Sequence, residues 1–188
     1  MADLRLTVDV AAPAGVVFAA ATDWDRQGEW MLGTRVRGTH LGGHAVGGRL
    51  EAFTGIGRVG FLDTLEVTSW DPPRRCEVLH TGRVVRGTGV FLVEDLGGGC
   101  SRFVWSEQLD LPLGAVGRAG WRLLRPVFAA GVLASLRKFA RWTEEQTSRL
   151  CPSALSCGFP AQMAAGGLIS RSRPGIVRIE PPLSPAVR

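Results

Sequence analysis

Apolar and polar residues alternate from Leu4 to Val10, which is the period-two pattern of a strand with one buried face. The alternation stops at Pro13, and the apolar positions Val17, Phe18 and Ala21 then predict a short helix that begins near this proline. A second short helix is expected over residues 24–31. The chain therefore opens with one strand followed by two small helices.

Six further β-like runs follow, at residues 34–41, 48–54, 59–70, 74–85, 86–95 and 101–111. Short turns rich in glycine or proline separate them, as at residues 71–73 and 95–99. Consecutive strands joined by short loops favour antiparallel pairing. With the first strand, the pattern predicts a seven-stranded antiparallel sheet.

From Gly114 the apolar period changes to three or four residues, which predicts one long helix that ends near Leu150. Its apolar stripe consists of Trp121, Leu124, Phe128, Val132, Ser135, Phe139 and Trp142. Pro126 predicts a kink or a restart within it. Because such a stripe must be covered, we expect the helix to lie against the sheet. The predicted fold class is α+β, with a curved sheet around a C-terminal helix.

Residues 151–188 show no sustained periodicity and contain six of the chain's 11 prolines. They are interpreted as a disordered tail, which leaves residues 1–150 as one ligand-binding domain. Residues 151–170 carry no charge and approach the length of a membrane span, but prolines, glycines and serines interrupt them. No stable membrane insertion is therefore expected.

The charge is unevenly distributed along the 188 residues, whose net charge is +5. The tail carries four arginines against one glutamate, so the body is left at only +2. Neither a broad basic face for phosphate binding nor a nucleic-acid partner is therefore expected. The first residues lack the basic and apolar regions of a secretory signal, so we expect a cytoplasmic protein.

Several short motifs lack the neighbouring elements or residues that their usual function requires. Gly55–Gly60 matches GxGxxG, but a strand-like run follows it where a dinucleotide site needs a helix, so a hairpin turn is predicted. His40 and His44 have a metal-like spacing, but a loop separates them and no third ligand lies nearby. The cysteines (Cys76, Cys100, Cys151, Cys157) give no zinc spacing and no disulfide framework. Neither a metal nor a cofactor is expected.

The main indication of a functional site is a set of polar residues that lie on the apolar face of their predicted strands. Asp63 shares a face with Phe61 and Leu65, and Arg86 with Thr88, Val90 and Leu92. Glu107 is framed by Trp105 and Leu109, and His80 follows Val78 in phase. Buried ionic groups are costly unless they are paired or solvated, so an internal cavity would explain them. A bulge that shifts the phase, or a solvated strand end, would explain them equally well.

The order of elements resembles the START-like (SRPBCC) helix-grip superfamily, and within it the polyketide cyclase/dehydrase and lipid-transport group of bacterial proteins. The resemblance covers residues 3–149. It rests on Leu6–Phe18, Ala21–Met31, Ser69–Arg74 and the helix segments Leu111–Gly114, Arg125–Phe128 and Ser135–Phe139.

The resemblance implies a helix-grip fold with a long apolar cavity between the sheet and the C-terminal helix. By analogy, Trp24 and Trp30 would lie near its entrance. Five apolar residues would line or back it: Phe53, Trp105, Trp121, Leu124 and Phe128. Ordinary core packing is the alternative for each of these aromatic residues.

Three functions are compatible with these observations. The first is the binding of an apolar or amphipathic small molecule such as a lipid, acyl chain or polyketide, by a monomer or homodimer. The second is a polyketide cyclase or dehydrase, with His80 or Glu107 as general base, Arg86 stabilising enolate charge and Asp63 assisting. The third is a protein-interaction or toxin-like module with its basic tail as the contact. Arg118, Arg122 and Arg125, along one side of the long helix, could aid contact with a membrane or an acidic partner, and a solvated helix face explains them equally well. Six tryptophans and no tyrosine favour holding a ligand over transforming it.

Overall fold

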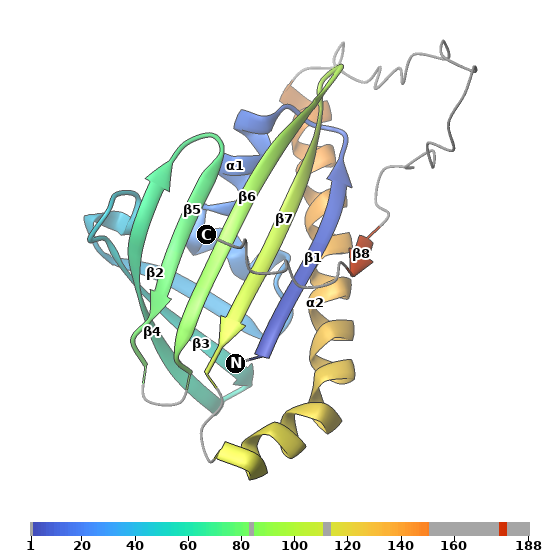
Figure 1. Cartoon of the computed structure of the whole chain (residues 1–188). Helices are drawn as coiled ribbons and strands as arrows, with labels where there is room; N and C mark the ends of the chain where they lie inside the picture. Colours follow the sequence, from blue (N-terminus) through green and yellow to red (C-terminus); the bar gives the residue numbers. More distant parts are fainter. Residues whose placement is uncertain (1, 83–84, 111–113, 151–176, 180–188) are drawn as a thin grey trace, which may run out of the picture.

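A computed structural model describes residues 2–82, 85–110, 114–150 and 177–179 (Figure 1). The chain begins with β1 (Ala2–Val10), α1 (Ala14–Ala21) and the 3-10 helix η1 (Trp24–Glu29). The elements that follow are β2 (Thr34–His40), η2 (Leu41–Gly43), β3 (Arg49–Ile56), β4 (Val59–Asp71), β5 (Arg75–His80), β6 (Gly87–Gly97), β7 (Cys100–Leu109), α2 (Gly114–Leu150) and β8 (Val177–Ile179). The predicted order of strand, small helices, strands and long helix is confirmed.

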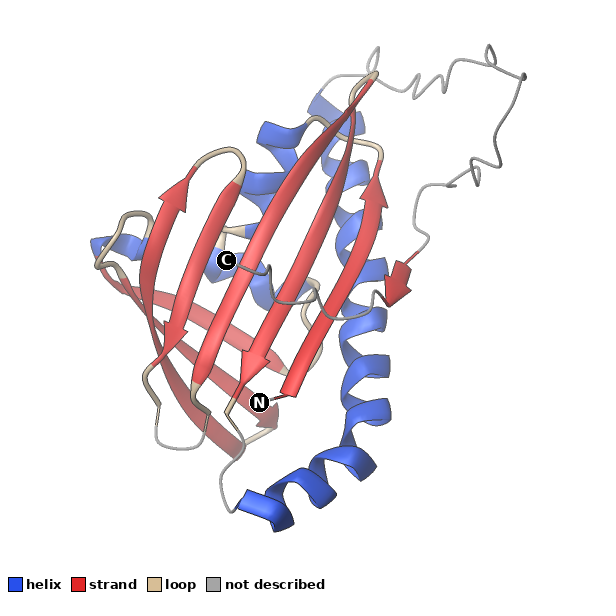
Figure 2. Cartoon of the chain, in the orientation of Figure 1, coloured by secondary structure: helices blue, strands red, loops and turns tan. Residues whose placement is uncertain are grey.

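The strands form a single antiparallel sheet in the order β2-β3-β4-β5-β6-β7-β1-β8. Strands β2 to β7 pair with their neighbours in sequence, and β1 completes the meander beside β7. Figure 2 shows the sheet curving, with α1 and α2 on the same side of it. The predicted seven-stranded curved sheet and its C-terminal helix, the α+β helix-grip fold, are therefore confirmed.

Helix α2 is continuous across Pro126, so the predicted restart does not occur. Figure 1 shows the helix changing direction in its N-terminal part, as a kink near a proline would produce. Its C-terminal half packs against the sheet. Leu136, Phe139 and Ala140 are fully buried there, together with Leu6 and Phe103 of the sheet. The core that stabilises the fold therefore lies between the C-terminal half of α2 and the sheet.

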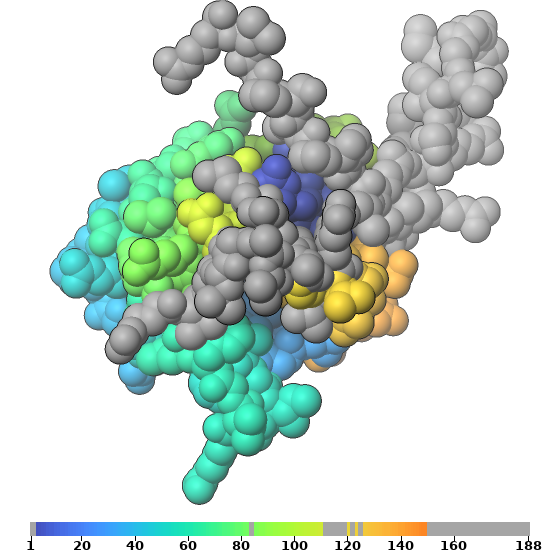
Figure 3. All heavy atoms as spheres, turned by 60° about the horizontal axis from the view of Figure 1, so that its bottom comes forward, coloured from blue at the N-terminus to red at the C-terminus, as the bar shows by residue number. Residues whose placement is uncertain are grey.

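The GxGxxG segment forms the β3–β4 hairpin, as predicted. Ile56 pairs with Val59, and the two residues between them make the turn. Gly57 has a φ of 63°, a left-handed conformation that residues with a Cβ rarely adopt. Figure 3 shows the hairpin projecting beyond the body of the molecule.

Part of the predicted tail takes a regular form. Residues 177–179 form β8, which pairs with Leu6–Val8 at the edge of the sheet. The rest of residues 151–188, and the disorder predicted for them, lie outside the described residues. Cys100 is disulfide-bonded, which the cysteine spacing did not predict. No helix in the described part of the chain is long and apolar enough to cross a membrane.

Candidate functional site

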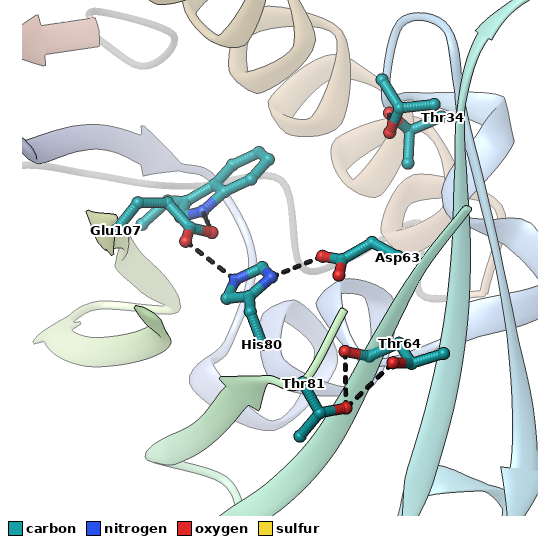
Figure 4. Close-up of polar contacts among 8 residues, drawn as sticks. Thr34, Asp63, Thr64, His80, Thr81 and Glu107 are labelled. Atoms are coloured by element: carbon teal, nitrogen blue, oxygen red, sulfur yellow. Dashed lines mark hydrogen bonds and ion pairs between the residues drawn. The ribbon is translucent and has the colours of Figure 1, made fainter. Parts of the chain in front are cut away.

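Three side chains from three strands meet on the inner face of the sheet (Figure 4). Nδ1 of His80, at the end of β5, lies 2.6 Å from Oδ2 of Asp63 on β4. Nε2 of the same ring lies 3.1 Å from Oε2 of Glu107 on β7. All three side chains are at most 10% exposed. The imidazole therefore lies between two carboxylates, a cluster that we call the Asp63–His80–Glu107 triad.

Strand register brings the first two members of the triad together. His80 pairs with Leu65 across β4 and β5, and Asp63 precedes Leu65 by two residues on the same face. Side chains two apart on a strand point to the same side, so Asp63 is a diagonal neighbour of His80. Diagonal neighbours lie within reach of long or aromatic side chains, and the imidazole spans the gap.

Two glycines leave room for the carboxylates. Gly89 on β6 pairs with Glu107, and a Cβ at this glycine would lie 3.1 Å from Oε1 of Glu107 and 3.0 Å from the side chain of Val78. Without that Cβ, Glu107 can reach across β6 toward His80. A Cβ at Gly82 would collide with Oδ1 of Asp63. The missing side chains of Gly89, in β6, and of Gly82, after the end of β5, therefore leave the space that the two carboxylates occupy.

The triad holds His80 in its charged form. Burial lowers the pKa of His80, but hydrogen bonding to Asp63 and Glu107, together with the negative charge of these carboxylates, outweighs burial and raises this pKa from 6.5 to about 9. With its ring protonated, His80 donates to both carboxylates, and Trp105 donates its Nε1–H to Oε1 of Glu107 over 2.7 Å. Oδ1 of Asp63 is buried and has no hydrogen-bond partner in the described part of the chain.

The triad forms part of the wall of a cavity of about 300 Å³ between the sheet and α2. The lining is mostly apolar and includes Met31, Val36, Ala52, Leu109 and Val132. Leu32, Phe61 and Phe128 also line it and are 52%, 37% and 39% exposed, so they lie at its opening.

Five of the predicted site residues are brought together around this cavity. Asp63, His80 and Glu107 form the triad, and Trp105 and Phe128 line the same space. The inward phase predicted for Asp63 and for Glu107 is therefore correct. Of the two explanations left open for the ionic residues, a bordering cavity is the one that applies to Asp63 and Glu107.

Arg86 does not belong to the site, and its predicted inward position is wrong. Strand β6 begins only at Gly87, and its buried residues are Gly89 and Val93, so the opposite phase faces inward. Arg86 shares its phase with the exposed Thr88, is itself exposed, and does not line the cavity. The stabilisation of enolate charge that we expected from it has no basis in this position.

The cavity-lining role expected for Phe53 is also wrong. Its neighbours Ala52 and Thr54 line the cavity, and alternation along β3 places Phe53 on the other face. There its ring lies 5.7 Å from the guanidinium of Arg35.

The two tryptophans expected at the entrance are instead buried. Trp24 is 4% exposed and donates its Nε1–H to the carbonyl of Gly43, and Trp30 is fully buried against Phe139. Trp121 and Leu124 lie on α2, as predicted, but their side chains are outside the described residues. The same holds for Arg118, Arg122 and Arg125.

Sequence reasoning missed several polar residues of the lining. The hydroxyl groups of Thr34 on β2 and Thr54 on β3 form a hydrogen bond with an O–O distance of 3.0 Å, and both residues line the cavity. Ser135 accepts the backbone N–H of Leu32 and donates to the carbonyl of Gly131. Each threonine lies two residues from an apolar lining residue, so the period-two pattern used for Asp63 would have found the pair.

Solved structures of many other proteins share this fold. ZhuI aromatase/cyclase from Streptomyces sp. R1128 aligns over 78% of this chain and 95% of its own, with 17% identity and a TM-score of 0.64. The protein TTHA0849 from Thermus thermophilus aligns over 78% and 100%, with 15% identity and a TM-score of 0.64. A norcoclaurine synthase point mutant of Thalictrum flavum, in complex with a transition-state analogue, aligns over 78% and 96%, with 16% identity and a TM-score of 0.57. At these identities the likeness shows a common fold and nothing more.

The sequence itself identifies the family. Residues 1–144 match the family described as polyketide cyclase/dehydrase and lipid transport. No curated protein matches the chain. The chain therefore belongs to the polyketide cyclase/dehydrase and lipid-transport family, as its sequence motifs suggested.

Proposed function

We propose that this member of the polyketide cyclase/dehydrase and lipid-transport family binds an apolar or amphipathic small molecule in the cavity beneath α2. The observation that carries the proposal is the composition of the wall, which is apolar except for the triad and a few hydroxyl and amide groups. Ligand sites in proteins commonly combine an apolar lining with a small number of placed polar groups. Apolar burial would supply affinity, and the triad would orient the polar end of the ligand.

The size of the cavity constrains the ligand. A volume of about 300 Å³ is at the lower end of the range for small-molecule pockets. A ligand with one or two fused rings, or a medium-length chain, would fill it. The partly exposed Leu32, Phe61 and Phe128 at the opening would cover part of such a molecule.

Filling the cavity from α2 tests the proposal. Gly131 lines the cavity, and a Cβ at this position would meet no atom within 4 Å, so Gly131→Phe should occupy ligand space without a backbone clash. Ala130→Phe is the matched control, because Ala130 is exposed and does not line the cavity. Native mass spectrometry of protein purified without detergent should show bound apolar mass in the wild type and in the control. The mass should be absent from Gly131→Phe.

Equal loads of bound mass in Gly131→Phe and in the wild type would contradict binding at this place. A wild-type protein that carries no bound mass and gives no tryptophan fluorescence change with any apolar probe would contradict binding altogether. Because the chain has no tyrosine, the emission of Trp105 in the cavity wall is free of tyrosine background.

The triad favours a second candidate, an acid–base enzyme of the cyclase or dehydrase type. His80 carries a proton between two carboxylates and borders the cavity, so its Nε2–H could be transferred to a carbonyl oxygen once it gives up its hydrogen bond to Glu107. Glu107 would then accept a proton from a carbon next to the carbonyl, and Asp63 would hold the ring in place. A short poly-β-keto thioester is a suitable probe. Unchanged product formation in both His80→Ala and Glu107→Gln would exclude this chemistry.

A further inference from the structure

The charge of the cavity wall bears on the kind of ligand that it accepts. Among the lining residues that the structure describes, the ionisable ones are Asp63, His80 and Glu107, and none is a lysine or an arginine. Since His80 is held protonated between two carboxylates, the triad has a net charge of −1. The apolar surroundings make this charge effective over several ångströms, because they screen it far less than water does.

Hydrogen-bond donors in the triad are already engaged. Both ring N–H groups of His80 point at carboxylates, and the N–H of Trp105 is used on Glu107. Each carboxylate offers about four lone-pair sites, so most acceptor capacity of the triad is unused. Oδ1 of Asp63, on a side chain that is 7% exposed, has no hydrogen-bond partner among the residues that the structure describes. The triad therefore lacks donors and has acceptors in excess.

We propose that the cavity selects ligands whose polar end is neutral or cationic and carries a hydrogen-bond donor. An alcohol, a phenol, an enol or an amine meets this requirement. A carboxylate or a phosphate does not, because it brings acceptors and a negative charge to a wall that already has both. This inference rests on the proposed binding function and specifies the ligand class of the same cavity.

The hydroxyl pair of Thr34 and Thr54 adds a second requirement of opposite kind. One of these hydroxyls donates to the other, which leaves one hydroxyl hydrogen in the pair for an acceptor on the ligand. Figure 4 shows Thr34 lying apart from the triad. A ligand with a donor at one place and a carbonyl or ether oxygen farther along would satisfy both groups.

Three probes that share a naphthalene ring and differ in their polar group test this selectivity. They are 2-naphthylmethanol, 2-naphthylmethylamine and 2-naphthoate, which are neutral, cationic and anionic near neutral pH. Isothermal titration calorimetry gives their dissociation constants without interference from naphthalene fluorescence. We expect the alcohol and the amine to bind at least about tenfold more tightly than the carboxylate, the size of effect that one unit charge in a partly buried site produces.

A charge-removing variant tests the cause of this ranking. Glu107→Gln leaves a neutral triad and keeps an oxygen for Trp105, so the preference for amine over carboxylate should shrink at least about fivefold. Glu145→Gln makes the same change in net charge at an exposed position of α2 outside the cavity, and its ranking should match the wild type. Asp63→Asn removes the other carboxylate and should act in the same direction, so it replaces Glu107→Gln if that variant does not fold.

The outcomes distinguish the inference from the function on which it rests. Tight binding of the carboxylate in the wild type, or a ranking that neither Glu107→Gln nor Asp63→Asn alters, would overturn the selectivity while leaving ligand binding intact. If none of the three probes binds at millimolar concentration, the proposed function is contradicted and the selectivity with it.

Discussion

The C-terminal half of α2 and its middle, around Phe128 and Val132, face the same sheet but have very different surroundings. In the C-terminal half, Leu136, Phe139 and Ala140 are fully buried. In the middle of the helix, Phe128 is 39% exposed and Val132 faces the cavity. The apolar stripe of the helix runs through both regions with the same spacing, so its sequence alone does not separate a filled region from a hollow one.

Aromatic side chains fill the space between the C-terminal half of α2 and the sheet. The ring centroid of Phe139 lies 4.8 Å from that of Trp30 and 4.8 Å from that of Phe103. No such cluster occupies the space under Phe128 among the described residues, where the sheet instead carries Ala52, Thr54 and the triad. The comparison indicates a division of labour, in which one half of the helix stabilises the fold and the other leaves room for a ligand.

The largest expected effect comes from removing an aromatic ring in the filled half. Phe139→Ala leaves a cavity between Trp30 and Phe103, and such truncations cost about 3–5 kcal/mol of unfolding free energy. Urea denaturation followed by tryptophan fluorescence measures this loss. Leu133→Ala provides a control on the same helix, because Leu133 is only partly buried and should cost less. Equal losses in the two variants would contradict the division.

The second-largest expected effect is a pH dependence of the unfolding free energy that the proton on His80 causes. Its pKa is about 9 in the folded protein against an ordinary value of 6.5, so the folded state binds this proton more tightly than the unfolded state does. The stabilisation is complete below a pH of about 6.5 and is lost as the pH rises through about 9, which amounts to about 3 kcal/mol. Urea denaturation between about pH 6 and about pH 10 measures it, with His80→Asn as the reference.

Other groups also titrate over this range, so the informative quantity is the difference between the two proteins. The unfolding free energy of the wild type should fall more steeply with pH than that of His80→Asn. Parallel curves would show that the triad does not hold a proton on His80.

A smaller effect is expected from filling the space beside Asp63. The Cβ of Gly82→Ala would collide with Oδ1, so Asp63 must move away from His80. Weakening this hydrogen bond should cost about 1–2 kcal/mol and lower the pKa of His80, which NMR titration of the ring would detect. Gly15→Ala is the control, since a Cβ there meets no atom within 4 Å. A pKa of His80 that is the same in Gly82→Ala and in the wild type would contradict the proposed role of this glycine.

The fold was predictable because its signals are local. The alternation at Leu4–Val10, the change of period at Gly114 and the strand that follows Gly60 each depend on a few neighbouring residues. Strand β8 was missed because three residues are too few to show a period, and β1 rather than the tail itself provides their pairing partners.

The site was predictable only where strand phase was certain. Asp63 and Glu107 lie in long runs that stay in phase, so their inward position followed from the sequence. Arg86 was misplaced because the sequence pattern took the wrong face of β6 as inward: Gly89 and Val93 are buried, whereas Arg86 shares the outward phase of Thr88. That His80 bridges the two carboxylates depends on register across four strands and on a missing Cβ at Gly89, neither of which a single strand can reveal.

The smallest effect on stability should accompany a large effect on binding. Phe128→Ala removes a ring that is 39% exposed at the cavity opening, so its cost in unfolding free energy should be about 1 kcal/mol or less. Affinity for 2-naphthylmethanol should nevertheless fall at least about fivefold, because this ring covers part of the bound molecule. The same residue type, eleven positions before Phe139 on one helix, would then serve binding in one half and stability in the other. If Phe128→Ala loses as much stability as Phe139→Ala and keeps its affinity for the probe, Phe128 belongs to the core and does not cover a bound ligand.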